Sequence, residues 1–560
     1  MNDSSTSVFD RYHPKIRRWI RRQGWNSLRS VQKRAAPFLL GDPQDIVITA
    51  ATAGGKTEAA FFPIATQVAE DWAEEDLGAF SVLYVAPLKA LINDQFGRLQ
   101  EIFSSLHVPV FRWHGDVSSS RKKKARERGG VLLITPESLE AQLICHGATL
   151  SDLLSPLRFI VVDELHAFIG TERGRQLQSL LYRVRLAAQS KVPRVGLSAT
   201  LGDMSLASQF LRPGDSESVK KIVDSSETQE VHIQLRGYKK QPPQIEDTDK
   251  EKQSPTTPQK SGSGDNIEIA QHLFSKLRGG RHIVFADRRK DVEVFSDLLH
   301  RFSERDGTHG EFRAHHGSLS QSLREEAEER LRGGRKPTTV VATRTLELGI
   351  DVGSVESVCQ IGAPYSVASL RQRLGRSGRR DSSSKLRLYV REPEITPDSP
   401  PVDHLRPSLV RATAAIQLLA EGWLEPPVVG ALHLSTLVQQ VLSLIAQHGG
   451  LNASQGYEAL CEHGPFRTVS EEQFAKLLRD LGNANLIKQT HRGTLVLDLE
   501  GERLVGHYDF YAAFQSPTEY RLVTEGNEIG AVPADAIDPE DPFLIFAGQR
   551  WAVLVIVFEN

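Results

Sequence analysis

Cysteine is scarce in this sequence, with three residues among 560. Cys145, Cys359 and Cys461 stand far apart and form neither the paired spacing of a zinc site nor a disulfide framework. The scarcity excludes a disulfide-rich secreted domain, so we expect a reducing compartment and a cytoplasmic protein.

Long apolar runs and an excess of charge are also missing. No stretch approaches the roughly 18 apolar residues that cross a bilayer, and the opening MNDSSTSVFD lacks the apolar run of a signal peptide. We therefore expect no membrane partner. The formal net charge is −2, which neither favours nor excludes nucleic acid, because backbone amides and a few placed cations suffice to bind phosphates.

What the sequence does contain is an alternation of short apolar runs and amphipathic helical patterns. This alternation predicts an α/β fold with two wound parallel sheets in tandem. The strands of the first sheet are expected at Asp45–Thr49, Ser81–Ala86, Gly130–Thr135, Phe159–Asp163 and Val195–Ser198. Those of the second are expected at Arg281–Ala286, Glu311–His315, Thr338–Ala342, Ser357–Ile361 and Lys385–Val390.

A chain of this length should form about three to five domains. Residues 241–266 are rich in Pro, Ser, Lys and Asp, and we expect them to be a disordered insertion between domains at 1–235 and 267–400. After residue 400 the pattern changes to helices followed by a short strand pair over 401–499, and then to short strands and turns over 500–560. The last segment fits a small sheet or barrel.

The first candidate site is a glycine-rich turn between a strand and a helix. It reads Ala50-Ala-Thr-Ala-Gly-Gly-Lys-Thr57. In such a turn the backbone N–H groups approach phosphates, a lysine reaches the β- and γ-phosphates, and a Ser or Thr hydroxyl binds Mg²⁺. The pattern predicts a nucleotide site formed by Thr52, Ala53, Gly54, Gly55, Lys56, Thr57 and Glu58. The strict motif has Gly at position 50, and an ordinary glycine-rich turn is the alternative.

The second candidate site is an apolar strand that ends in two carboxylates and an imidazole, Phe159-Ile-Val-Val-Asp-Glu-Leu-His166. Asp163 is expected to bind Mg²⁺ together with Thr57, and Glu164 to orient and deprotonate the attacking water. His166 is expected to couple the nucleotide site to its neighbours. A plain charged loop is the alternative, but the position after a phosphate loop in the same sheet argues against it.

With these motifs in this order, the sequence resembles the superfamily 2 helicases, and among them the large helicase-related (Lhr) family. The resemblance covers most of the chain. It implies two RecA-like domains, then a winged-helix domain and the start of a β-barrel, with ATP and Mg²⁺ as cofactors. It further implies a single-stranded DNA or RNA track, a duplex or hybrid substrate, and a possible protein partner. Gln32 matches the upstream glutamine that reads adenine, and Gly349 and Asp351 match residues near the ribose.

The resemblance also assigns residues that hold the nucleic acid and the γ-phosphate. Candidate strand contacts are Pro87, Lys89, Thr135, Pro136, Glu137, Ser138, His316, Gly317, Thr343 and Thr345. Ser198-Ala-Thr200 matches the segment that links hydrolysis to domain movement. Gln372, Arg376 and Arg379 lie in the arginine-finger motif, where a cation from a second domain stabilises the charge that develops on the γ-phosphate.

Two positions depart from the family pattern: Ala53 stands where glycine is usual, and Leu165 where valine is more frequent. Neither change removes a reacting group. The motifs predict ATP hydrolysis coupled to nucleic acid but do not predict what the hydrolysis achieves, so three functions remain open. These are a helicase moving 3′ to 5′ in DNA repair or phage defence, a duplex remodelling motor without strand separation, and a nucleotide-gated sensing subunit. Trp423, Tyr508, Phe510 and Tyr511 are candidates to stack on bases, with core packing as the alternative.

Overall fold

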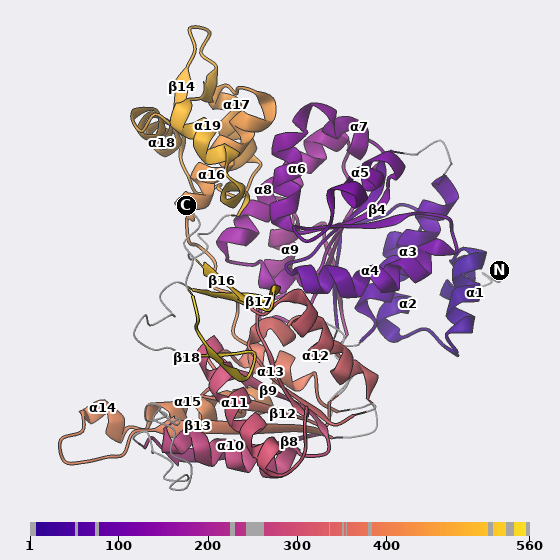
Figure 1. Cartoon of the computed structure of the whole chain (residues 1–560). Helices are drawn as coiled ribbons and strands as arrows, with labels where there is room; N and C mark the ends of the chain where they lie inside the picture. Colours follow the sequence, from indigo (N-terminus) through magenta and orange to yellow (C-terminus); the bar gives the residue numbers. More distant parts are fainter. Residues whose placement is uncertain are drawn as a thin grey trace. The chain divides into compact units, whose positions relative to one another are not determined.

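The computed structural model describes residues 7–50, 54–72, 78–224, 230–241, 263–334, 336–349, 352–353, 355–378, 383–512, 519–533 and 543–555. The chain forms two compact units, each built from two separate stretches (Figure 1). The first unit comprises Met1–Ser226 and Pro426–Ser516, and the second comprises Glu227–Glu425 and Pro517–Asn560. Among the described helices, none combines the length and apolar character needed to cross a bilayer.

A seven-stranded parallel sheet in the order β3-β4-β2-β5-β6-β1-β7 organises the first unit. Its strands are β1 (Ile46–Thr49), β2 (Phe80–Val85), β3 (Val110–Trp113), β4 (Gly130–Ile134), β5 (Phe159–Val162), β6 (Arg194–Ser198) and β7 (Lys220–Val223). Successive strand residues face opposite sides: Ile46 and Ile48 join one apolar core, and Val47 joins the other. Burial on both faces explains why these strands read as continuous apolar runs.

Helices cover both faces of this sheet. One core lies beneath α1 (Pro14–Arg22), α2 (Ser30–Leu39), α3 (Lys56–Asp71) and α4 (Lys89–Ser104). The opposite core lies beneath α5 (Ser119–Arg128), α6 (Pro136–Cys145), α7 (Leu150–Leu154), α8 (Glu172–Ala188) and α9 (Ser205–Leu211). Short 3₁₀ turns complete the set at Val8–Arg11, Gly147–Thr149 and Leu165–Ala167.

The second stretch of the first unit has the arrangement of a winged helix, and it packs on α6 and α8 through α16 (Figure 1). Its elements are α16 (Leu434–His448), α17 (Ala453–Tyr457), a π-turn (Glu458–Glu462), α18 (Glu471–Asn483), β14 (Ile487–Gln489), β15 (Leu495–Leu497), α19 (Leu499–Gly506) and a 3₁₀ turn (Tyr508–Tyr511). Ile144 and Tyr182 of the α/β domain pack against its apolar core. The two stretches therefore share buried surface.

A six-stranded parallel sheet in the order β10-β11-β9-β12-β13-β8 organises the second unit. Its strands are β8 (Val231–Lys239), β9 (Arg281–Ala286), β10 (Phe312–His315), β11 (Thr338–Ala342), β12 (Ser357–Ile361) and β13 (Ser384–Glu392). Its helices are α10 (Gly264–Leu277), α11 (Arg289–Arg305), α12 (Gln321–Gly333), α13 (Val367–Leu374), α14 (Pro401–His404) and α15 (Pro407–Ala420), with a 3₁₀ turn at Arg344–Leu346.

The C-terminal stretch forms two antiparallel pairs, β16 (Glu519–Thr524) with β17 (Asn527–Pro533), and β18 (Phe543–Phe546) with β19 (Gln549–Ala552). Val532 and Phe546 enter the apolar core of the second unit. These pairs are the small C-terminal sheets that the sequence led us to expect.

Both sheets and their helical covers confirm the two RecA-like domains expected from the sequence. The expected strands are present within two residues at each end, but β3, β7 and β8 were not anticipated. β3 and β8 are only partly buried, so their residues lack the continuous apolar signal. The expected boundary at residue 235 falls inside β8, which pairs with β13 in the second sheet. Helices α14 and α15 likewise group with the second unit, and α19 with the first.

Candidate functional site

The residues expected to hold a nucleotide lie at the carboxyl ends of the parallel strands β1, β5 and β6, which are neighbours in the sheet. This edge is where open α/β sheets bind their ligands. Helix α3 begins at Lys56, after Gly55 in the left-handed conformation at φ 85°. A Cβ at Gly55 would lie 3.0 Å from Nε2 of Gln32, so this turn requires glycine. Thr52 and Ala53 lie outside the described residues.

Gln32 and Lys56 make contacts that place them beside this turn. The Gln32 Oε1 accepts a hydrogen bond from the backbone N–H of Arg29 at 2.9 Å, which orients the amide. The Lys56 ammonium donates to the backbone carbonyl of Ser198 over 3.2 Å. Thr57 is nearly buried in the first turn of α3. Glu58 is buried and pairs with Arg98.

Asp163 and Glu164 follow β5 and differ in environment. Both Asp163 carboxylate oxygens accept hydrogen bonds, one from the backbone N–H of Glu164 at 2.8 Å and one from the hydroxyl of Tyr84. Burial, together with the charge of Glu164, raises the pKa of Asp163 to about 6, while the Tyr84 hydrogen bond and Lys56 oppose the rise. Burial also raises the pKa of Tyr84, so its hydroxyl remains a donor.

His166 connects this acidic pair to the end of β6. Its Nδ1 accepts a hydrogen bond from the backbone N–H of Ala199 at 3.2 Å and lies 3.4 Å from a carboxylate oxygen of Glu164. Ala199 belongs to the Ser-Ala-Thr segment. The imidazole therefore contacts both the acidic pair and the segment expected to transmit hydrolysis.

In the second unit, Arg373 forms the centre of a buried polar network. Its guanidinium donates to Glu347 Oε2 over 2.8 Å, contacts Gln360, and lies 4.9 Å from the centre of the Phe285 ring. Arg376 is also buried and donates to the backbone carbonyl of Glu347 at 2.7 Å. Gln372 lies on α13 directly before Arg373, and Gly349 closely follows Glu347. Asp351 and Arg379 lie outside the described residues.

The paired histidines at the end of β10 have different contacts. His315 is buried and contacts the Thr345 hydroxyl at 2.8 Å and Glu328 at 2.9 Å, while Thr343 lies 3.5 Å from Thr345 through the two hydroxyls. The His316 side chain is 2% exposed and its Nε2 lies 2.6 Å from Glu293. Gly317 follows at the surface. His316 therefore does not present its ring to solvent, and the buried His315 imidazole contacts Thr345, whose hydroxyl in turn contacts Thr343.

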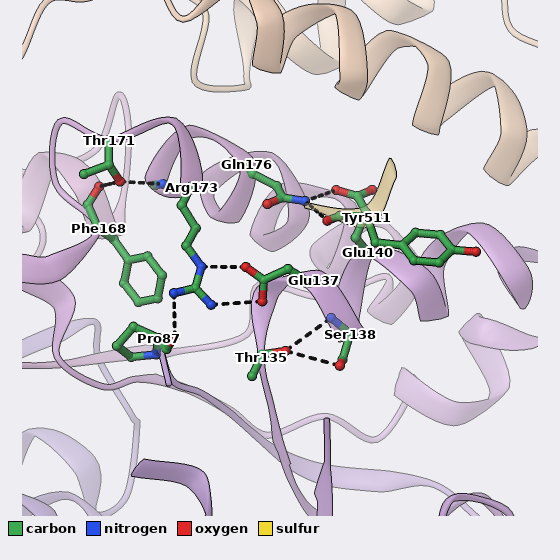
Figure 2. Close-up of polar contacts among 11 residues, drawn as sticks. Pro87, Thr135, Glu137, Ser138, Glu140, Phe168, Thr171, Arg173, Gln176 and Tyr511 are labelled. Atoms are coloured by element: carbon green, nitrogen blue, oxygen red, sulfur yellow. Dashed lines mark hydrogen bonds and ion pairs between the residues drawn. The ribbon is translucent and has the colours of Figure 1, made fainter. Parts of the chain in front are cut away.

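A groove runs over the first unit where β2 and β4 end. It has a volume of about 1110 Å³, and Pro87, Lys89, Thr135, Glu137 and Ser138 line it. Figure 2 shows the polar contacts of Pro87, Thr135, Glu137 and Ser138. Thr135 caps α6 by accepting from the Ser138 N–H at 3.3 Å, directly before Pro136, the first residue of that helix.

Arg173 of α8 ties the groove together (Figure 2). Its guanidinium donates to both carboxylate oxygens of Glu137, at 2.6 and 2.9 Å, and also to the backbone carbonyl of Pro87. The Arg173 guanidinium thus links the segment at Pro87 to the segment at Glu137, although the two are far apart in sequence. The planar guanidinium is well suited to bind both oxygens of a carboxylate.

Three contributors escaped the sequence interpretation. Tyr84 lies inside an apolar strand, and its contact with Asp163 follows from the pairing of β2 with β5. Arg373 lies in the arginine-rich motif, but its position as a buried cation depends on its ion pair with Glu347, which is distant in sequence. Arg183 interrupts the apolar stripe of α8 and pairs with Glu140 over 2.6 Å, with both side chains buried. For Arg183, the sequence signal was a charged residue at a position of α8 where the pattern predicts an apolar core residue.

Comparison with known proteins gives two family matches in this chain. The DEAD/DEAH box helicase family matches residues 29–207, and the helicase conserved C-terminal domain matches residues 265–381. The "ATP-dependent helicase Lhr-Core" of Saccharolobus solfataricus is 28% identical, over 99% of this chain and 63% of that protein. The protein of the same name from Methanothermobacter thermautotrophicus is 30% identical, over 69% and 44%.

The fold is also similar to solved structures. The Mycobacterium smegmatis helicase Lhr, in a structure bound to single-stranded DNA and AMP-PNP, matches with a TM-score of 0.73 and 25% identity, over 92% of this chain and 64% of that one. The helicase MrfA, bound to DNA and AMPPNP, shares the fold with a TM-score of 0.73 and 21% identity, over 97% and 70%. The chain spans at most 63% of the length of the Lhr-Core relatives from Sulfolobus acidocaldarius and S. solfataricus.

The two helicase family matches, the Lhr-Core relatives and the shared fold agree with the motifs at the strand ends. The chain belongs to the superfamily 2 helicases and, within them, to the Lhr family.

Proposed function

We propose that this chain is an ATP-driven motor that hydrolyses ATP with Mg²⁺, moves 3′ to 5′ on a single strand, and separates DNA or RNA–DNA duplexes. The observation that carries the proposal is the contact of His166 with both Glu164 and Ala199, because it joins the proposed catalytic carboxylate to the segment expected to transmit hydrolysis. DNA repair is the proposed setting, with phage defence as the alternative.

Lys56 and Glu164 act directly on the nucleotide in this proposal. The Lys56 ammonium exchanges its contact with the Ser198 carbonyl for the β- and γ-phosphates. Glu164 orients the attacking water and accepts its proton. Gln32, held by Arg29 beside the glycine turn, reads the adenine.

The donor set fits Mg²⁺. Thr57 offers a hydroxyl and Asp163 a carboxylate, and oxygen donors are the ligands this ion prefers. A cation bound there would offset the burial and the Glu164 charge that raise the pKa of Asp163. When bound, the ion neutralises charge that develops on the transferred phosphoryl group. The hydroxyl of Tyr84 keeps the carboxylate of Asp163 in one orientation.

Lys89, Thr135 and Ser138 are proposed to contact the sugar-phosphate backbone of the track. They line one groove, and Arg173 fixes the two segments that carry them. The groove residues offer hydroxyl and ammonium donors, which bind phosphates without regard to sequence. Thr343 and Thr345 are the proposed contacts from the second unit.

The test is steady-state ATPase activity with Mg²⁺, in the absence and presence of single-stranded DNA, single-stranded RNA and duplex DNA. We expect strong stimulation by at least one polymer, and Glu164→Gln should reduce kcat by 10²-fold or more while nucleotide binding is retained. Glu127→Gln, on the exposed face of α5, is the matched control. An activity that no polymer stimulates would overturn the proposal.

The output of the motor needs a second assay, because the same nucleotide site would drive duplex remodelling. Displacement of a strand from a tailed duplex, beside displacement of a triplex strand from blunt DNA, distinguishes the two. Triplex displacement alone would identify a translocase or remodelling subunit without strand separation.

A further inference from the structure

The groove over the first unit has one wall that comes from the end of the winged helix. Tyr508, Asp509, Tyr511 and Ala512 line it opposite the segments that hold Lys89 and Thr135. These residues follow α19 and are separated by more than 300 positions from the helicase motifs of the same groove. The groove is therefore a joint product of the α/β domain and the winged helix.

The charge of the groove favours an anion. Among the residues that line it, five are cationic (Lys89, Lys122, Lys123, Arg126 and Arg173) and two are acidic (Glu137 and Asp509). Arg173 neutralises Glu137 through its two hydrogen bonds. Lys122 and Arg126 lie over the Trp113 ring, at 5.9 and 5.1 Å from its centre. This face combines positive charge with an aromatic surface.

Tyr508 is presented to this groove from a rigid base. Its side chain is 75% exposed, and its ring centre lies 4.6 Å from that of His507. Two residues on, Phe510 is buried in the winged-helix core. The buried Phe510 anchors the turn from which the exposed Tyr508 ring projects.

Side-chain amides from two helices fix the backbone of the same turn. Gln439 of α16 donates to the Phe510 carbonyl at 2.8 Å. Gln176 of α8 donates to the Tyr511 carbonyl at 2.8 Å, as Figure 2 shows. Gln176 also contacts Glu140 at 3.0 Å, and Glu140 is held by Arg183. The turn is thus attached to both parts of the first unit.

We propose that Tyr508 stacks on a base of the single strand that occupies this groove, and so acts as a strand-positioning residue outside the helicase motifs. The inference rests on the proposed function, which supplies the strand. Cations beside exposed aromatic rings are the combination that holds single-stranded nucleic acid without sequence preference. The cations bind phosphates, and the ring binds a base.

The experiment compares Tyr508→Ala, Tyr508→Phe and Lys122→Ala with the unaltered chain, and Leu504→Ala serves as the control on the preceding helix. Affinity is measured by fluorescence anisotropy with an oligothymidine strand and with an abasic strand of the same length, over a range of salt concentrations. The abasic strand keeps the phosphates and removes the bases.

We expect Tyr508→Ala to lose about 5- to 100-fold in affinity for the oligothymidine strand and nothing for the abasic strand. Its salt dependence should stay unchanged, because no phosphate contact is lost. Tyr508→Phe should bind normally, since stacking needs the ring and not the hydroxyl. Lys122→Ala should make the negative slope of log affinity against log salt concentration shallower by about 0.7, because one phosphate contact is lost.

Equal losses of Tyr508→Ala on both strands, or no loss on either, would overturn the inference. If ATP hydrolysis is stimulated by a strand while Tyr508→Ala binds normally, the stacking role fails and the proposed motor stands. If no strand binds or stimulates the unaltered chain, the proposed function itself fails.

Discussion

The backbone N–H of Ala199 donates a hydrogen bond to Nδ1 of His166 at 3.2 Å, and this nitrogen also lies 3.4 Å from Glu164. A single imidazole nitrogen cannot accept from Ala199 and donate to Glu164 at the same time. The position of its proton therefore selects one of the two partners. One imidazole nitrogen thus lies within reach of both the acidic pair and the Ser-Ala-Thr segment.

His166→Ala should separate hydrolysis from movement. Glu164 keeps its place after β5, so we expect strand-stimulated ATPase to fall by no more than about 10-fold, whereas duplex separation should fall by 10²-fold or more. Parallel ATPase and strand-displacement assays measure the two rates on one preparation. Equal losses in both would show that His166 serves the chemical step alone.

The buried pair of Glu140 and Arg183 should be critical for the stability of the first unit. Glu140 also accepts hydrogen bonds from Gln176, Gln440 and Ser443. Glu140→Gln leaves the Arg183 charge buried without a counter-ion, and we expect a loss of about 3–5 kcal/mol in the free energy of unfolding. Denaturant unfolding followed by tryptophan fluorescence measures it.

A control and a rescue sharpen this test. Glu127→Gln breaks an exposed pair with Lys123 and should cost less than about 0.5 kcal/mol. The double change Glu140→Leu with Arg183→Met should recover much of the stability, because both charges are removed together. A Glu140→Gln variant as stable as the unaltered chain would contradict the assignment.

His282 should make the second unit acid-sensitive. It is a buried residue of β9 that contacts the hydroxyl of Ser357 in β12 at 2.8 Å, and burial lowers its pKa from 6.5 to about 4. Between about pH 6.5 and pH 4, His282 is therefore protonated in the unfolded chain and neutral in the folded chain. Stability is fully present above pH 6.5 and is lost as the pH falls through this window, by on the order of 3 kcal/mol.

The measurement is thermal unfolding at several pH values, with His282→Gln as the comparison. Because Gln does not titrate, the variant should show a shallower decline between pH 6.5 and pH 4, whatever its stability at neutral pH. Parallel declines in the two proteins would rule out His282 as the cause.

Glu293 should hold the hairpin of β18 and β19 on α11. Its carboxylate accepts from the backbone N–H groups of Ala547 at 2.9 Å and Gly548 at 2.7 Å, and contacts His316. Glu293→Gln loses one acceptor oxygen, so amide hydrogen exchange over residues 543–552 should accelerate about 10- to 100-fold. Asp297→Asn, which affects only the partly exposed Arg550 contact, should have a smaller effect.

The sequence patterns predicted those features that depend on residues close together in the chain. Buried parallel strands can be recognised in the sequence as continuous apolar runs. The phosphate turn and the acidic pair can be recognised because each is a contiguous motif. Contacts between distant segments could not be predicted in this way. Tyr84 reaches Asp163 only because β2 and β5 are neighbours, and Arg173 joins Pro87 to Glu137 across two loops.

His316 illustrates the same limit. The motif around it matches a strand-contacting segment, yet its ring faces Glu293 and lies 5.7 Å from the Phe546 ring. More than 200 residues separate His316 from that phenylalanine, and no local pattern at either position reveals the contact.

The assignment of 426–516 to the first unit and 517–560 to the second has a practical consequence for making fragments of this protein. The polypeptide passes from one unit to the other three times, so a single cut yields neither unit intact. A fragment ending at Glu425 would contain the seven-stranded sheet but would expose Arg183, Glu140, Ile144 and Tyr182 to water. Such a fragment should aggregate or lose stability, whereas a fragment that also carries residues 426–516 should keep these side chains covered.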